Sequence, residues 1–594
     1  MDFQNYYQSE LSYLREVGKL FAEKHPSLAG MLAERGGDPD VERLLEGFAF
    51  VAARFRQRID DNIPELAESL SELLLPHLLR PTPAATIVQF KGASDGARGA
   101  YALPAGLQLL STPVRGTRCR FRTTRPLDLL PLTLNGLRLD DASSSSPTLT
   151  LRFELAEGAR SSVFRRAGVR LHLHGELATT SQLYLWLVRH LSSVSVHAPG
   201  GRTVELGARC VRPVGLDEHD ALVPWPSFSP LGPRLLLEQF TLQAKFLFVD
   251  IVDLDRAADL EGNSFELVFR FAKPPALPAR LAQDAVRLHC VPAVNLFDVS
   301  ADAVRTSALG RPVLLRAQGV EPLHAEVFEV KSAVGMSPER RERRSYAPFH
   351  AFRHLLPGSA LTGFYKLTRE KSPIDEGLHT YIQLTSGSAA GSAQHGAAQS
   401  AKLAPSLTVA LDPETLSIEL VCTNRSLPTE LQVGDVHLAT ADTPAGVTFA
   451  NITQISRPTR PPVGSDLIWH FVSHLGCSHR SMADIEALKA MLLLYNRQDE
   501  VDYQGGAANR ARVEAIRKVS MRATTRIHLG APVRGSLFEL ELEQSGFGSE
   551  GDAYLFGAVL HRFFALGAPL NSFSDLQLVL LPTKLSYRFQ AELS

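Results

Sequence analysis

Apolar residues recur at helical spacing in the N-terminal part of the chain. After Asp38 they follow one another at intervals of three and four positions, which places them on one face of a helix. Asp38 suits the N-cap, and Pro39 suits the first helical position, where the missing N–H of proline costs nothing. The opposite side of this helix is charged. The apolar face consists of Val41, Leu44, Leu45, Phe48, Val51, Ala52, Phe55 and Ile59.

Two further helices are expected beside this one. A turn at residues 60–62 precedes a helix that begins at Pro64, is kinked by Pro76 and ends at Pro81. Residues 4–25 form the other helix, with an apolar stripe of Tyr7, Leu11, Leu14, Val17 and Phe21. Residues 1–82 therefore form a helical arm with more apolar surface than three helices bury among themselves. The arm packs on the rest of the chain or joins a bundle with other subunits, and the pattern leaves both open.

The period of the pattern changes after Pro83. Short alternating or β-branched segments, separated by turns rich in Gly, Ser and Pro, indicate strands. We expect residues 83–330 to form one or two β-sandwich or barrel-like domains. The predicted strands cover residues 86–90, 108–110, 119–122, 149–155, 169–174, 183–188, 246–252 and 265–271.

The C-terminal part is mixed. Helices are expected at 467–475, 482–495 and 552–566, and strands at 515–529, 536–543, 576–581 and 586–591. The segment 385–405 consists of small residues and is expected to be a flexible loop. The fold class predicted from these patterns is multidomain α+β. It combines a helical arm (1–82), β-rich domains (83–330) and a C-terminal α+β domain (331–594).

Composition narrows the class of protein. The 594 residues are 44% hydrophobic and 21% charged, as in ordinary globular proteins. A net charge of −1 gives no reason to expect nucleic-acid binding, because nucleic-acid-binding domains usually carry an excess of basic residues. No apolar run reaches the roughly 18 residues of a membrane span, and the first twenty residues lack the apolar core of a signal peptide. These features favour a cytoplasmic protein.

The chemistry-bearing residues form no recognisable catalytic motif. The five cysteines are scattered without a C-x-x-C pair, so buried reduced thiols are expected rather than disulfides or a zinc knuckle. His470, His474 and His479 lie close together, but no acidic residue stands at a known ligand spacing, which favours a helix-end role over a metal site. We therefore expect no metal, no cofactor and no enzymatic activity.

Several segments carry a resemblance to a known family. The stretch from Tyr6 to Leu32, then DPDVERLLEGFAFVAAR and LLLPHLLRPTP, closely resembles the N-terminus of the TssF (ImpG/VasA) family of bacterial type VI secretion. Further matching segments follow in the family's order and extend to the C-terminal region. They are EVFEV at 326–330, YAPF at 346–349, VCTNRSLPTEL at 421–431, RPP at 460–462, HFVSHLGCSHRSM at 470–482 and YLFGAVLHRFFALGAPLNSFSDLQL at 554–578.

The resemblance implies an assembly role without catalysis. Proteins of this family are baseplate subunits that pair as two copies with one TssG in a wedge, and TssK attaches the wedge to the inner-membrane complex. Six wedges surround the VgrG spike, with TssE nearby and the TssB–TssC sheath above them. The implied protein is a hetero-oligomeric subunit of a cytoplasmic baseplate.

On this reading the helical arm supplies apolar faces to a bundle with a second copy and TssG, and the C-terminal region makes wedge or dimer contacts. The candidate interface residues are Tyr7, Leu11, Leu14, Leu44, Leu45, Phe48, Phe55, Ile59, Leu555, Phe556, Phe563 and Phe564. Two alternatives remain, a metal-dependent hydrolase that uses His470 and His474, and a stand-alone ligand-binding β protein.

Overall fold

A computed structural model describes most of the chain. The residues described are 3–24, 39–92, 101–140, 147–165, 168–226, 229–272, 277, 281–305, 311–336, 343–349, 361–372, 375, 377–385, 414–463, 465–476 and 481–591. They fall into two compact units. Unit 1 comprises residues 1–79 and 462–471, and unit 2 comprises residues 80–461 and 472–594. Of the loop expected at 385–405, residues 386–405 lie outside the described residues.

Unit 1 is helical. Helix α1 (Phe3–Lys24) contacts helix α3 (Pro39–Leu74), and a 3-10 turn, η2 (Pro76–Leu79), follows. The unit also holds the first residues of α6 (Ser465–Gly476). The predicted helix at 4–25 and the helix that begins at Pro39 are confirmed.

The predicted turn at residues 60–62 is wrong, because α3 continues through it and through Pro64 as one helix of 36 residues. An interior proline costs about 3 kcal/mol, and helix propagation on both sides of it outweighs that cost. The helix ends at Leu74, so Pro76 opens the 3-10 turn and does not kink a longer helix.

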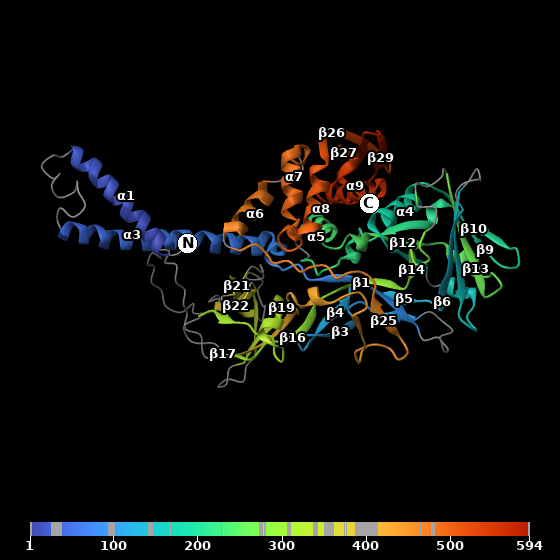
Figure 1. Ribbon diagram of the computed structural model, residues 1–594, viewed down its shortest axis with the longest axis horizontal. Coiled ribbons are helices and arrows are strands. Elements are labelled where there is room, and N and C mark those ends of the chain that lie inside the picture. Colours follow the sequence, from blue (N-terminus) through green and yellow to red (C-terminus); the bar gives the residue numbers. More distant parts are fainter. Residues whose placement is uncertain are drawn as a thin grey trace. The chain divides into compact units, whose positions relative to one another are not determined.

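Unit 2 is built largely from antiparallel sheets (Figure 1). One six-stranded sheet has the order β24-β3-β4-β15-β1-β25. Its strands are β1 (Ala85–Lys91), β3 (Gln108–Val114), β4 (Thr117–Thr123), β15 (Cys290–Val294), β24 (Val436–Leu438) and β25 (Thr448–Asn451). Strands from both sides of residue 330 therefore share one sheet.

Two smaller sheets come from the middle of the chain. The five-stranded sheet, of order β10-β9-β13-β7-β6, contains β6 (Leu132–Asp140), β7 (Thr148–Leu155), β9 (Leu191–His197), β10 (Thr203–Glu205) and β13 (Ser264–Phe271). The four-stranded sheet, of order β11-β12-β8-β14, contains β8 (Val169–Leu173), β11 (Val211–Val214), β12 (Phe248–Ile251) and β14 (Val286–Leu288). A two-stranded ribbon joins β2 (Tyr101–Leu103) to β5 (Leu127–Leu129).

A further sheet follows along the chain in the order β16-β23-β19-β20-β21-β22-β18, with β17 beside β23. It contains β16 (Phe297–Ser300), β17 (Val304–Arg305), β18 (Val313–Leu314), β19 (Glu326–Met336), β20 (Arg343–Pro348), β21 (Leu361–Lys371), β22 (Leu378–Thr385) and β23 (Thr415–Thr423). The expected domain boundary at 330/331 falls inside β19, and the three-part domain division stays a prediction.

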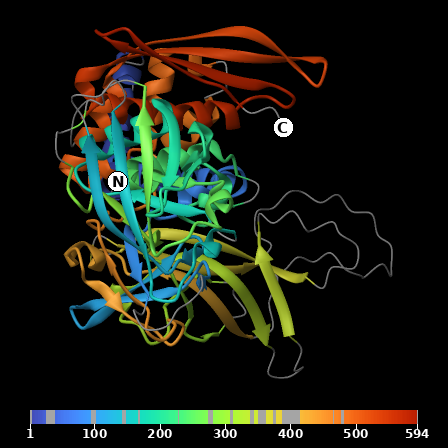
Figure 2. The same ribbon diagram turned by 90° about the vertical axis from the view of Figure 1, so that its right-hand side faces the viewer.

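The C-terminal sheet has the order β26-β27-β28-β29. It contains β26 (Ile516–His528), β27 (Ala531–Glu543), β28 (Phe573–Leu581) and β29 (Leu585–Phe589). Figure 2 shows its long orange and red strands. Three C-terminal helices accompany it, α7 (Ile485–Leu494), α8 (Tyr503–Glu514) and α9 (Glu550–Leu566). The multidomain α+β fold class is confirmed.

Two helices from the middle of the chain complete this core. Helices α4 (Leu177–Arg189) and α5 (Gly232–Thr241) both contact α9, which in turn packs on β28 (Figure 1). The strand expected at 183–188 is wrong, since these residues belong to α4. Residues 183–187 are buried on every side, and a short apolar run of that kind does not distinguish a strand from a buried helix.

Candidate interaction surface and pocket

Helix α3 exposes a row of large apolar side chains. Leu44, Phe48 and Val51 are 73%, 63% and 49% exposed, at spacings of four and three residues. Ala49 and Ala53 lie on a different face of the helix and are fully buried. Large apolar side chains in one continuous row are the usual sign of a surface that another molecule covers. We call Leu44, Phe48 and Val51 the α3 row.

The other expected interface residues of unit 1 are less exposed. Leu11 is buried, while Tyr7, Leu14 and Leu45 are half-buried. The side chains of Phe55 and Ile59 lie outside the described part of α3. Sequence reasoning did not single out Trp469, which α6 presents at 70% exposure. The sequence feature that could have identified it is a large aromatic residue in a short amphipathic helical segment.

The four expected interface residues of α9 are core residues in this structure. Leu555, Phe556 and Phe564 are fully buried, and Phe563 is 3% exposed. Phe564 stacks on Phe538 of β27, with ring centroids 4.2 Å apart. These side chains hold α9 against its sheet and its neighbouring helices and are not available to a partner. The exposed α3 row is therefore a better candidate for an interface than these residues of α9.

The segment 421–431 ties two sheets together. The backbone N–H of Asn424 donates to Oδ1 of Asn295 at 2.7 Å, and Nδ2 of Asn295 donates to Oδ1 of Asn424 at 2.9 Å. The same Oδ1 accepts the backbone N–H of Arg120 in β4, and Nδ2 of Asn424 donates to the carbonyl of His324. Both asparagines are almost fully buried, so every polar atom of this cluster needs its partner.

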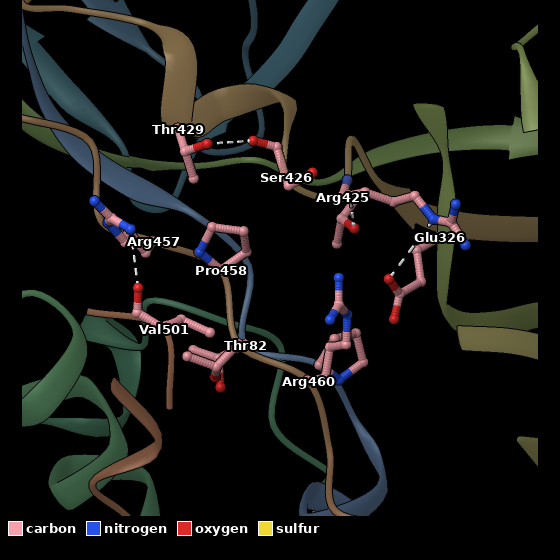
Figure 3. A pocket seen from close by; sticks show the side chains of 12 residues that line it. Thr82, Glu326, Arg425, Ser426, Thr429, Arg457, Pro458, Arg460 and Val501 are labelled. Carbon is pink, nitrogen blue, oxygen red and sulfur yellow. Dashed lines mark hydrogen bonds and ion pairs between the residues drawn. The ribbon is translucent and has the colours of Figure 1, made fainter. Parts of the chain in front are cut away.

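A pocket of about 310 Å³ opens beside this cluster, within unit 2 (Figure 3). Five separate stretches of the sequence contribute to its described wall, and we call it the arginine pocket. Its wall consists of Pro81, Thr82, Glu326, Thr423, Arg425, Ser426, Thr429, Arg457, Pro458, Thr459, Arg460 and Val501.

Arg425 is the most constrained side chain of the arginine pocket. Its backbone lies in the left-handed region, at φ 52°, and its guanidinium is paired with Asp375 at 2.6 Å. Glu326 lies 3.9 Å from the Nε of Arg425. Burial raises the pKa of Glu326, against the opposing effect of Arg425 and Arg460. Gly377 leaves room for this arrangement, because a Cβ there would collide with the Arg425 guanidinium.

Two of the histidines considered as metal ligands, His470 and His474, lie in the described part of α6. His474 is half-buried, and its Nδ1 lies 3.0 Å from the hydroxyl of Tyr495. Burial lowers the pKa of His474 to about 4. His479 lies outside the described residues. Within the residues described, no group of three His, Cys, Asp or Glu side chains has the geometry of a metal site.

The described cysteines are buried thiols without a disulfide partner. They are Cys119, Cys210, Cys290 and Cys422, and burial raises the pKa of each. Among the described helices, none is both long enough and apolar enough to cross a membrane.

Comparison with known proteins gives one consistent match along the chain. The family model described as "Type VI secretion system, TssF" matches residues 1–592. The type VI secretion system component TssF1 of Pseudomonas aeruginosa is 30% identical, over 96% of this chain and 95% of its own length.

Two solved structures are also similar. A chain of the TssK-TssF-TssG baseplate subcomplex, determined by cryo-electron microscopy, aligns with a TM-score of 0.79 and 30% identity. The alignment covers 93% of this chain and 99% of that chain. A chain of the type VI secretion baseplate complex aligns with a TM-score of 0.57 and 26% identity, over 100% and 99% of the two chains.

Proposed function

The chain belongs to the TssF family of the type VI secretion system, and from that premise we propose that it is a structural baseplate subunit that binds TssG and TssK. The similarity to a chain of the TssK-TssF-TssG subcomplex supports this role, because it extends over nearly the whole of both chains. The proposed role is mechanical, and the subunit contributes no catalytic step.

The finer form of the proposal concerns the complete assembly. Two copies of this chain pair with one TssG in a wedge, and six wedges surround the VgrG spike, with TssE nearby and the TssB–TssC sheath above. TssK links the wedge to the inner-membrane complex on the cytoplasmic side. A change between two packings of these interfaces would transmit the firing signal to the sheath, as bistable interfaces do in other assemblies.

The proposed contact with TssG rests on the exposure of the α3 row. Leu44 and Phe48 are among the most exposed large apolar side chains of the described residues, on a helix whose alanines are buried. Burying a side chain of this size is worth about 1.5–3 kcal/mol. An apolar helix face of the partner would remove this row from water and complete a shared helical bundle.

The test is co-expression of the double variant Leu44→Asp/Phe48→Asp with TssG. A carboxylate inside the bundle is expensive to bury, so co-purification should fall at least tenfold. Arg43→Asp is the matched control, because it places the same side chain in the same turn at an exposed polar position. The control should retain TssG. Full retention of TssG by the double variant would refute the role of the α3 row.

A further inference from the structure

We propose that the arginine pocket binds a small oxyanion that carries a carboxylate or phosphate group. The site lies in unit 2, outside the helices that carry the proposed contact with TssG. Three features of its described wall support this: a cluster of guanidinium groups, two buried hydroxyls without partners, and a volume larger than a single water requires.

Cationic side chains gather in the wall. Among its described residues, Arg425, Arg457 and Arg460 contribute guanidinium groups and Glu326 contributes a carboxylate. Asp375, outside the wall, neutralises part of Arg425. Figure 3 shows the side chain of Arg460 extending from the lower wall toward Arg425 and Glu326. Cationic side chains that share one pocket repel each other, and an anion bound between them removes that repulsion.

Two threonines add hydrogen-bond donors. Thr82 and Thr459 form an isolated antiparallel bridge, with N–H···O distances of 2.8 and 3.0 Å in the two directions. Residues opposite each other in such a pair direct their side chains to the same face. Both side chains line the pocket and are at least 97% buried, and neither hydroxyl has a hydrogen-bond partner among the described residues.

An unpaired buried hydroxyl is unfavourable, and an oxyanion that accepts a hydrogen bond from it recovers part of that cost. The guanidinium fork matches the paired oxygens of carboxylates and phosphates. The volume of about 310 Å³ is roughly ten times the share of one water molecule in the liquid. The pocket therefore has room for inorganic phosphate or a short dicarboxylate together with its waters. Arg457, exposed at the rim, leaves the site reachable from solvent.

The experiment uses the full-length chain. Inorganic phosphate and glutarate are titrated separately by calorimetry at constant ionic strength, with chloride as the reference anion. We expect saturable binding of at least one of the two oxyanions, and the comparison between them identifies the preferred group. Arg460→Gln should weaken the binding at least tenfold. Arg212→Gln, at an exposed position outside the pocket, should bind as the unaltered chain does.

If Arg460→Gln does not fold, Arg457→Gln provides the same test, because that side chain is exposed and donates a hydrogen bond to the carbonyl of Val501. Absence of saturable binding of both oxyanions to the unaltered chain would overturn the proposal. Binding of equal strength in the folded pocket variants would overturn it too, because the anion would then occupy another place. Neither outcome bears on the co-purification of TssG.

Discussion

Asn424 and Asn295 hold each other by two hydrogen bonds in the interior of unit 2, at 2.7 and 2.9 Å. Asn295 follows β15, and Asn424 follows β23, so the pair joins the six-stranded sheet to the sheet of β16–β23. Nδ2 of Asn295 also donates to the carbonyl of Arg120 at 2.8 Å. Asn424 lies in the segment VCTNRSLPTEL and directly precedes Arg425, which lines the arginine pocket.

Asn424→Ala should lower the free energy of unfolding by about 2–4 kcal/mol. The substitution leaves the N–H of Arg120 and the carbonyl of His324 without their buried partner, and each unsatisfied group costs about 1–3 kcal/mol. Urea denaturation followed by fluorescence measures the change. Asn135→Ala, at an exposed position, is the control and should stay within about 0.5 kcal/mol. Similar effects of the two substitutions would contradict the role of the junction.

The buried carboxylate of Glu238 should be among the most sensitive charged groups. Its Oε1 accepts the backbone N–H of Leu222 at 2.7 Å, and its Oε2 pairs with Lys245. Both charged side chains are essentially fully buried. Glu238→Gln leaves Lys245 without its counter-charge, and breaking a buried pair in this way costs about 3–5 kcal/mol.

The matched control for this prediction is Glu205→Gln. Glu205 forms an exposed pair with Arg270 at 3.9 Å, and such pairs contribute about 1 kcal/mol at most. Thermal unfolding of the two variants in the same buffer gives the comparison. The prediction fails if Glu238→Gln unfolds at the same temperature as Glu205→Gln.

Acid should destabilise the chain through its buried histidines. Nε2 of His289 accepts the backbone N–H of Leu130 at 3.2 Å, which requires a neutral ring, and burial lowers the pKa of His289 to about 4. The unfolded ring has a pKa of about 6.5, so between about pH 6.5 and 4 the unfolded state binds more protons than the native state. The free energy of unfolding therefore falls as the pH falls through this window, by up to about 3 kcal/mol for this group.

Urea midpoints between pH 7 and pH 4 measure this dependence. Burial also lowers the pKa of His172 and His561, to about 3 and about 4, so they act in the same direction. His289→Asn should flatten the pH dependence, since asparagine tolerates the positive φ of 57° at this position. His219→Asn, at an exposed position, should leave it unchanged. An unaltered slope in His289→Asn would show that this ring does not contribute.

Two helical glycines should respond in opposite ways to alanine. A Cβ on Gly551, in the first turn of α9, would collide with the backbone of Ser181 and Gln182 in α4. Gly551→Ala should therefore separate the two helices and cost about 1–3 kcal/mol. Gly47 in α3 has no atom within 4 Å of such a Cβ, so Gly47→Ala should stabilise the helix by about 0.5–1 kcal/mol. Circular dichroism melts of both variants decide the signs. A stabilising Gly551→Ala would contradict the close approach of α4 and α9.

The amino-acid sequence by itself determined much of the local structure. Period-3.6 patterning predicted α1, the start of α3 and α9, and alternation predicted β1, β7 and β13, because these periods report how side chains are directed about the axis of their own element. The matching segments and their order along the chain were sufficient to identify the resemblance to the family. The same patterns did not predict α4 or the continuity of α3 through Pro64, since a short apolar run and a proline both allow two conformations.

Only the tertiary structure decided which apolar residues are core and which are surface. Phe48 and Phe556 occupy similar helical patterns, yet Phe48 is 63% exposed and Phe556 is fully buried. The arginine pocket brings Thr82 together with Arg425 and Arg460, which follow it by hundreds of positions in the chain. Periodicity describes a residue relative to its own helix or strand, whereas burial and pocket formation depend on which distant elements pack against it. That information lies in long-range contacts, and the local pattern does not contain it.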